Sequence, residues 1–262
     1  MTATLRWTDW SWDPPIVAAI ISAAAVYVWI LRSFPVRDRR PLYFWGGCFV
    51  LVVALLSPVH AGAAYLFTLH MVQHMLLMIV APPLLVLGMP ATLIGWVYQR
   101  AALRRLYREL VSPAPVTILY NGILLFWHLP AAYDATLRSP TIHALEHASF
   151  VAGGLLFWGI IASPSPRLAG ASVGMRLVMI GVADVVNFML GFYLAFADHP
   201  LYVYYTVVPR LWGLSPLDDL RLGGAAMWVM GQMMYAIPLL ALLYWFLWRG
   251  GEREGASARP AT

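Results

Sequence analysis

The chain has 262 residues, of which 61% are apolar and only 11% are charged, with a formal net charge of +5. A soluble domain carries roughly a quarter charged residues, so this composition excludes an ordinary soluble enzyme and indicates a membrane protein. The positive charge comes from arginine alone, in short segments between apolar runs. It therefore predicts orientation in a bilayer rather than binding to nucleic acid.

Seven apolar runs approach or exceed the length of about 20 residues that a helix needs to cross a membrane. In chain order, we expect helices at about 15–32, 42–57, 67–88, 114–130, 143–162, 174–196 and 224–248. The predicted fold class is all-α, a polytopic bundle of seven transmembrane helices in one membrane domain spanning 1–262. The polar segment 250–262 is expected to be a flexible cytoplasmic tail.

Two local features refine this prediction. Met1–Pro15 has no basic region leading into a cleavable apolar core, so we expect no signal peptide and a first run that stays as a helix. Within the third run, Pro82-Pro83 removes two backbone donors and should kink the helix.

The arginines predict the orientation of the bundle. Thirteen of the 17 lie in the alternate connections after the first, third and fifth runs and after the seventh. The four on the opposite side are Arg6, Arg138, Arg210 and Arg221. Because the arginine-rich side stays cytoplasmic, we expect the N-terminus outside and the C-terminus inside.

The histidines are expected to lie together at the outer side. His70 with His74, and His143 with His147, are i,i+4 pairs, which a helix places on one face. Two such pairs on facing helices offer four nitrogen donors to a metal ion, with His128 at a similar level. Histidines at a membrane interface also snorkel or cap helices, but two pairs on one side favour a metal or haem site. His60 and His199 share this side without being paired.

Five residues are assigned supporting roles. Gln73 and Glu146 lie within one turn of the histidines, where such acceptors usually orient metal-bound imidazoles. Met71 and Met75 offer soft sulfur that suits Cu(I), although methionine in an apolar helix usually serves packing. Asp184 falls near mid-depth in the sixth run. It serves either a proton or ion relay or a helix–helix hydrogen bond with Asn121 or Gln232.

Two other site types are disfavoured. His143–His147 matches the HxxEH pattern of a zinc peptidase class, which needs a further carboxylate ligand at the same depth. The remaining glutamates, Glu109, Glu252 and Glu254, are all expected on the cytoplasmic side. Cys48 is the only cysteine, so neither a disulfide framework nor a CxxC metal site exists, and it is expected to be a small apolar filler.

Several motifs are similar to those of a known family. They are His70-Met71-Val72-Gln73-His74-Met75-Leu76-Leu77, Ala81-Pro82-Pro83-Leu84-Leu85, Gly88-Met89-Pro90, Trp127-His128-Leu129-Pro130, His143-Ala144-Leu145-Glu146-His147, and Gly223-Gly224 with Met227-Trp228. Together they resemble the CtaG family of cytochrome c oxidase assembly factors, over the third to seventh runs.

The resemblance implies a multi-pass protein of the bacterial inner membrane that helps to assemble a haem–copper oxidase by delivering copper. His70, His74, His128, His143 and His147 are then the motif histidines that hold the metal. The expected partners are lipid and an oxidase subunit. Self-association into a homo-oligomer stays open, and neither nucleic-acid binding nor enzymatic activity is expected.

Two alternatives stay open beside the copper hypothesis. One is an outer-leaflet haem protein with facing axial ligands such as His74 and His147. The other is a metal-dependent membrane enzyme in which Glu146 acts as acid or base. Zinc could replace copper as the ion, because imidazole suits both.

Overall fold

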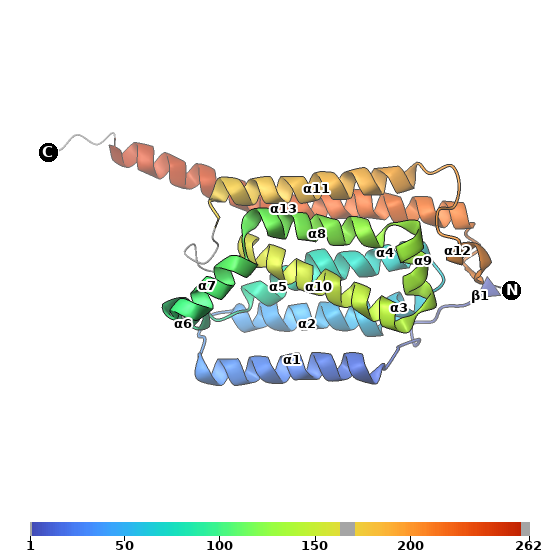
Figure 1. Ribbon diagram of the computed structural model, residues 1–262, viewed down its shortest axis with the longest axis horizontal. Coiled ribbons are helices and arrows are strands. Elements are labelled where there is room, and N and C mark those ends of the chain that lie inside the picture. Colours follow the sequence, from blue (N-terminus) through green and yellow to red (C-terminus); the bar gives the residue numbers. More distant parts are fainter. Residues whose placement is uncertain (1, 163–170, 258–262) are drawn as a thin grey trace.

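The structure, a computed structural model, describes residues 2–162 and 171–257. Its helices lie side by side in one elongated bundle (Figure 1). The only strands in the described part are β1 (Thr2–Ala3) and β2 (Arg210–Leu211), which form a short parallel pair. Arg167 and residues 258–262 lie outside the described residues. The segment 250–262 was expected to be a flexible tail, but its residues 250–257 continue the last helix, which ends at Ser257.

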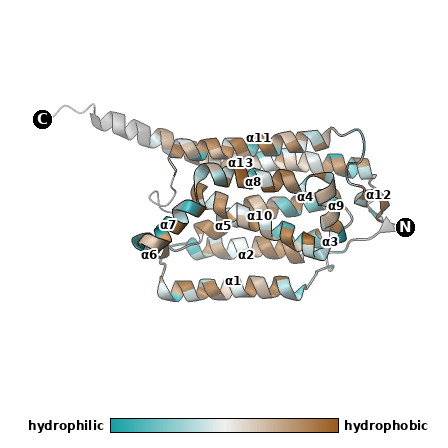
Figure 2. Cartoon of the chain, in the orientation of Figure 1, coloured by the Kyte–Doolittle hydropathy of each residue, from teal (hydrophilic) through white to brown (hydrophobic). Residues whose placement is uncertain are grey.

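Each of the seven predicted apolar runs contains a helix. These are α1 (Pro14–Ser33), α2 (Arg40–Leu56), the continuous α4–η1–α5 (Phe67–Met75, Leu76–Val80 and Ala81–Leu87), α8 (Pro113–Trp127), α10 (Pro140–Ile161), α11 (Val173–Ala195) and α13 (Pro216–Ser257). Hydrophobic residues dominate along them (Figure 2). The all-α class of a multi-pass membrane protein is confirmed.

Length and composition alone support fewer spans than seven. Among the described residues, five helices are long and apolar enough to cross a membrane. A sixth is counted if α8 and α9 (Pro130–Arg138), which meet at a 72° bend, form one span. Helix α2 is apolar but has only 17 residues.

Five shorter helices occupy segments that the sequence analysis treated as connections. They are α3 (Pro58–Ala63), α6 (Ala91–Gln99), α7 (Ala101–Leu110), α9 and α12 (Tyr204–Val207). Figure 1 places α3, α9 and α12 at one end of the bundle and α6 and α7 at the other. The apolar-run criterion misses such helices because they are too short or too polar to span a bilayer.

The irregularity expected at Pro82-Pro83 takes the form of a π-helical turn, η1, directly before the prolines. Pro82 has no N–H to give to the carbonyl of Met78, four residues earlier. The indole N–H of Trp158 on α10 donates to that carbonyl instead, at 3.0 Å. Gly154 allows this approach, because a Cβ there would lie 2.6 Å from Pro82 Cγ. The proline break is thus repaired by a neighbouring helix.

The helix that carries His70 and His74 lies at the centre of the bundle. Within its apolar window, 61% of residues are buried, compared with 6% in α1. Helix α1 joins the bundle through a small cluster in which Tyr27 stacks on Phe44 beside Cys48. Cys48 is buried there and reduced, as a small apolar filler would be.

Candidate metal centre

Helix α4 begins at a buried carboxylate supplied by α13. Leu66, at the N-cap position of α4, provides no side-chain cap. Asp219 accepts instead from the backbone N–H of Phe67 at 2.9 Å and of Thr68 at 3.0 Å. Arg210 pairs with the same carboxylate at 3.1 Å. The first turn of α4, and with it the position of His70, is therefore tied to α13.

Helix α10 begins in a way that its own sequence explains. Pro140 stands at the first helical position, where its missing N–H costs nothing. The side chain of Ser139 caps the helix by accepting from the N–H of Ile142. This start puts His143, Glu146 and His147 in the first turns, with spacings of three and four residues that share one face.

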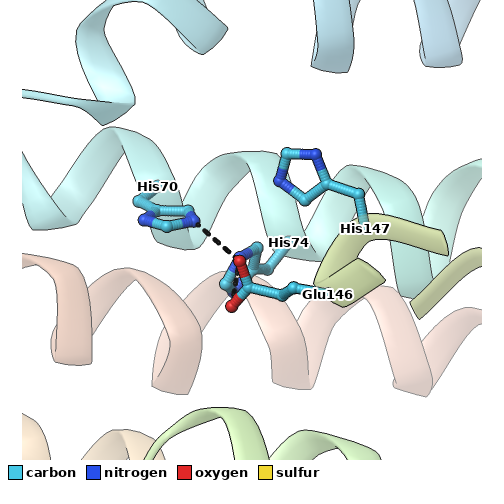
Figure 3. A group of neighbouring side chains, drawn as sticks. All are labelled: His70, His74, Glu146 and His147. Atoms are coloured by element: carbon cyan, nitrogen blue, oxygen red, sulfur yellow. Dashed lines mark ion pairs between the residues drawn. The ribbon is translucent and has the colours of Figure 1, made fainter. Parts of the chain in front are cut away.

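The two helices bring four potential ligands together. One ligand atom from each of His70, His74, Glu146 and His147 lies within 4.8 Å of the other three (Figure 3). His70 Nε2 is 3.6 Å from Glu146 Oε2, and His74 Nε2 is 3.4 Å from Glu146 Oε1. All four residues are buried, and His70 and Glu146 have no exposed surface.

These atoms have no hydrogen-bond partners among the described residues. They include Nε2 of His70, His74 and His147, and both carboxylate oxygens of Glu146. Leaving buried polar atoms unsatisfied costs about 1–3 kcal/mol each. A cation among them would satisfy all of them at once. Nitrogen donors with one carboxylate suit copper, zinc or iron.

His143 and His60 extend the cluster beyond these four residues. His143 Nε2 is 3.9 Å from Glu146 Oε2 and lacks a hydrogen-bond partner. The His60 ring stacks on the His143 ring, with centroids 5.8 Å apart. The sequence left the role of His60 in doubt, and the structure brings it to the edge of the cluster.

Gln73 fixes the hydrogen on the His60 ring. Its amide nitrogen donates to the carbonyl of Ala54 at 2.7 Å and contacts His60 Nδ1 at 2.9 Å. His60 Nδ1 must therefore accept, which leaves the hydrogen on Nε2. Burial lowers the pKa of His60, so the ring is neutral at physiological pH. His60 is a hydrogen-bond donor beside the cluster and has no free lone pair for an ion.

Two tyrosines orient His70. Tyr133 Oη is 2.8 Å and Tyr205 Oη 3.2 Å from His70 Nδ1. Tyr205 donates its own hydrogen to the carbonyl of Ala63 at 2.7 Å, and burial raises the pKa of Tyr205 well above its ordinary value. Since the Tyr205 hydrogen is committed, all contacts are satisfied when His70 Nδ1 carries the ring hydrogen. The lone pair of Nε2 then faces Glu146, as a metal ligand requires.

His128 and His199 are not among the four residues whose ligand atoms converge, although the His128 ring lies next to that of His74. His128 ends α8, where Nδ1 contacts the Leu124 carbonyl at 2.7 Å and Nε2 contacts Met71 Sδ at 3.3 Å. Its ring centroid is 6.0 Å from that of His74. His199 is exposed and bonded to Asp198, away from the cluster.

Of the two roles expected for Asp184, the structure contains a helix–helix hydrogen bond with Gln232, but the backbone carbonyl of Asp184 makes it and the carboxylate does not. Gln232 donates to the backbone carbonyl of Asp184 at 3.4 Å, and Asn121 donates to the Thr117 carbonyl on its own helix. The Oδ1 atom of Asp184 is buried without a hydrogen-bond partner. The structure therefore gives Asp184 no contact with the histidine cluster.

Sequence reasoning missed Tyr133, Tyr205 and Asp219 as supports of the site. All three are buried polar residues in or beside predicted connections. A buried aspartate near an apolar run was visible as a signal, but its partner on α4 is about 150 residues away. No local spacing in the sequence indicates such a pairing.

Comparison with known proteins gives a family-level similarity. The sequence model described as "cytochrome c oxidase caa3 assembly factor" (Caa3_CtaG) matches residues 23–249. No solved structure matches the chain.

The curated relatives that match are longer proteins. Two of them are uncharacterized proteins of Mycobacterium bovis and Mycobacterium tuberculosis. Each is 26% identical to this chain, over 95% of this chain and 41% of its own length. An uncharacterized protein of Mycobacterium leprae is 28% identical, over 90% of this chain and 39% of its own length. The chain thus spans about two fifths of the length of these relatives.

Proposed function

Because the chain belongs to the cytochrome c oxidase caa3 assembly factor family, we propose that it helps to assemble a haem–copper oxidase by holding copper and passing it to an oxidase subunit. The copper is cargo, held by His70, His74, His147 and Glu146, with His143 as a further ligand. His128 and Met71 stand beside this site as supporting groups.

The observation that carries the proposal is the convergence of unpartnered ligand atoms in a buried space. Three imidazoles and a carboxylate suit a single metal ion better than a haem. A haem iron takes two axial ligands from the protein, which would leave one imidazole and the carboxylate unused. Transfer from this site needs ligand exchange only, so no catalytic step is part of the proposal.

The proposed setting is the bacterial inner membrane, with seven crossings. Helix α2 and the bent pair α8–α9 then count as spans beside the five long helices. The arginine-rich α1–α2 connection and α7 lie at the end opposite to α3 and α9 (Figure 1). Since arginine-rich ends stay cytoplasmic, the histidine cluster faces the periplasm, with the N-terminus outside. Histidine ligands suit that oxidising side, where cysteine pairs would form disulfides.

Metal analysis of the purified protein tests the proposal. Copper content is measured after anaerobic loading of the wild type and of the Glu146→Gln and His147→Ala variants. Oxidase activity is measured in membranes of cells that carry each variant. The His199→Ala variant serves as the matched control, because His199 is exposed and outside the cluster.

We expect copper retention and oxidase activity to fall together in the cluster variants and to stay unchanged in the control. Unchanged copper content in both cluster variants would refute the site. A Soret band in the purified protein would favour the haem alternative and overturn the copper proposal.

A further inference from the structure

A small internal cavity adjoins the histidine cluster on its inner side. It has a volume of about 10 Å³ and lies between α4–η1, α8, α11 and α13. A space of this size holds roughly one water molecule or one ion of similar size. It is therefore too small for an organic ligand and suited to a single dehydrated ion or one water molecule.

Thioether sulfur is the commonest functional group in the wall of this cavity. Met71, Met75 and Met78 reach it from the α4–η1 segment, and Met227 reaches it from α13. The first three are spaced four and three residues apart, which places them along one helix face. All four are buried, with at most 3% of their surface exposed. Sulfur of this kind binds Cu(I) and other soft cations in preference to Zn²⁺.

His74 supplies the second observation, because it belongs to both sites. It lines the cavity and is also one of the four residues of the His/Glu cluster. Only 3% of its surface is exposed, and neither ring nitrogen has a hydrogen-bond partner. Its Nε2 atom faces Glu146 at 3.4 Å. The other ring nitrogen, Nδ1, also lacks a partner, in a wall made mostly of methionine and apolar side chains with Asn187 and Tyr235 as its other polar members.

A water molecule would find few partners in this space. Asn187 and Tyr235 also line it, but the Asn187 amide donates to the carbonyl of Met227 at 3.0 Å. The Tyr235 hydroxyl is paired with that of Tyr120 at 2.7 Å. A buried water usually needs two to four hydrogen bonds. The other lining residues that carry lone pairs are His74 and the four methionines, of which Met71 also contacts His128 Nε2 through its sulfur at 3.3 Å. Sulfur ligands suit a soft cation better than water.

We propose that this cavity is a second metal position, selective for a soft monovalent cation such as Cu(I), and separated from the His/Glu cluster only by His74. The proposal rests on the proposed function in that the same cargo occupies both positions. An ion moving between them exchanges nitrogen and oxygen ligands for sulfur. The single lone pair of the neutral His74 ring serves the cluster through Nε2 or the cavity through Nδ1, according to which nitrogen carries the hydrogen. The chain would then discriminate Cu(I) from Zn²⁺ by the inner position and not by the outer one.

Parallel loading with two ions separates the two positions. The full-length protein in detergent is loaded anaerobically with Ag(I), as a stable probe for soft monovalent ions, or with Zn(II), and the bound metal per chain is measured. The test variant is Met75→Leu with Met227→Leu, since leucine keeps the volume but removes the sulfur. The control is Met189→Leu with Met230→Leu, whose side chains are 57% and 39% exposed.

We expect the wild type to bind more Ag(I) than Zn(II) per chain and the test variant to lose this excess while keeping its Zn(II). The control should behave as the wild type. X-ray absorption of the Cu(I)-loaded wild type should show more sulfur neighbours per copper ion than the test variant, which keeps only Met71 and Met78 in the cavity wall.

Equal Ag(I) and Zn(II) stoichiometry in the wild type, or an excess of Ag(I) that survives in the test variant, would overturn the inner position. If the wild type binds no Zn(II), the result would instead refute the His/Glu site and the function proposed from it.

Discussion

The carboxylate of Asp219 on α13 accepts the backbone N–H of Thr68 at 3.0 Å, across 151 residues of sequence. It also accepts the Thr68 hydroxyl at 2.9 Å. This carboxylate has no exposed surface and is balanced by Arg210. One buried acid thus caps the helix that carries His70 and His74, and fixes how α4 meets α13.

Replacing Asp219 by alanine should destabilise the protein by about 2–5 kcal/mol, because it leaves the backbone N–H groups of Phe67 and Thr68 without their acceptor and removes the carboxylate that balances Arg210. Thermal unfolding in detergent measures the loss, and copper retention should fall as α4 shifts. Asp218→Ala is the matched control, since Asp218 is exposed and caps only its own helix through Ser215. A variant at position 219 as stable as the wild type would show that the cap is dispensable.

The tyrosine pair around His70 predicts a loss of metal affinity when both hydroxyls are removed. Tyr133→Phe together with Tyr205→Phe removes both hydroxyls that hold the His70 ring. Removing such supporting groups typically weakens metal binding by about 10–100-fold. Competition with a chromogenic chelator measures the affinity, with the exposed Tyr244→Phe as control. Unchanged affinity in the double variant would mean that His70 is not a ligand.

Gly154 should not tolerate even a methyl group. A Cβ there would meet Pro82 Cγ at 2.6 Å and the Met78 carbonyl oxygen at 3.0 Å. Forcing α10 away from α5 should cost about 1–3 kcal/mol in unfolding free energy. Gly159→Ala on the same helix meets nothing within 4 Å and should be neutral or stabilising by up to about 1 kcal/mol. Equal melting temperatures for the two variants would contradict this packing.

Trp158→Phe tests how the proline break is repaired. The variant removes the indole N–H from the Met78 carbonyl and leaves only the Tyr120 hydroxyl, at 3.5 Å. A buried carbonyl without a good donor costs about 1–3 kcal/mol. Thermal unfolding should show this loss, while copper content should stay near that of the wild type. A fall in copper content alone, without destabilisation, would contradict a purely structural role.

The sequence predicted the elements that depend on runs and short spacings. A helix lies within each apolar run, and the i,i+4 pairs on α4 and α10 converge at one end of the bundle. These are local properties of the chain. The sequence assigned Glu146 only a supporting role, yet its carboxylate lies beside both His70 and His74. The angle between α4 and α10 decides which side chain points toward the cluster, and the sequence does not reveal that angle.

Features that depend on distant contacts were not predictable. His60 comes to the cluster because α3 folds back beside α4, and nothing in its own segment indicates this. The bend of 72° between α8 and α9 brings Tyr133 onto His70, although the sequence suggested only a loop after His128. A short polar helix carries too few apolar residues to produce a readable pattern.

The bend at α8–α9 also has a kinetic consequence. Helix α9 crosses the end of the bundle, and its Tyr133 closes over His70, which has no exposed surface. On the His70 side, α9 separates the cluster from the surrounding water, whereas His143 remains partly exposed. If the cluster holds the proposed ion, release past His70 requires α9 to move, so a partner that displaces α9 would speed that release.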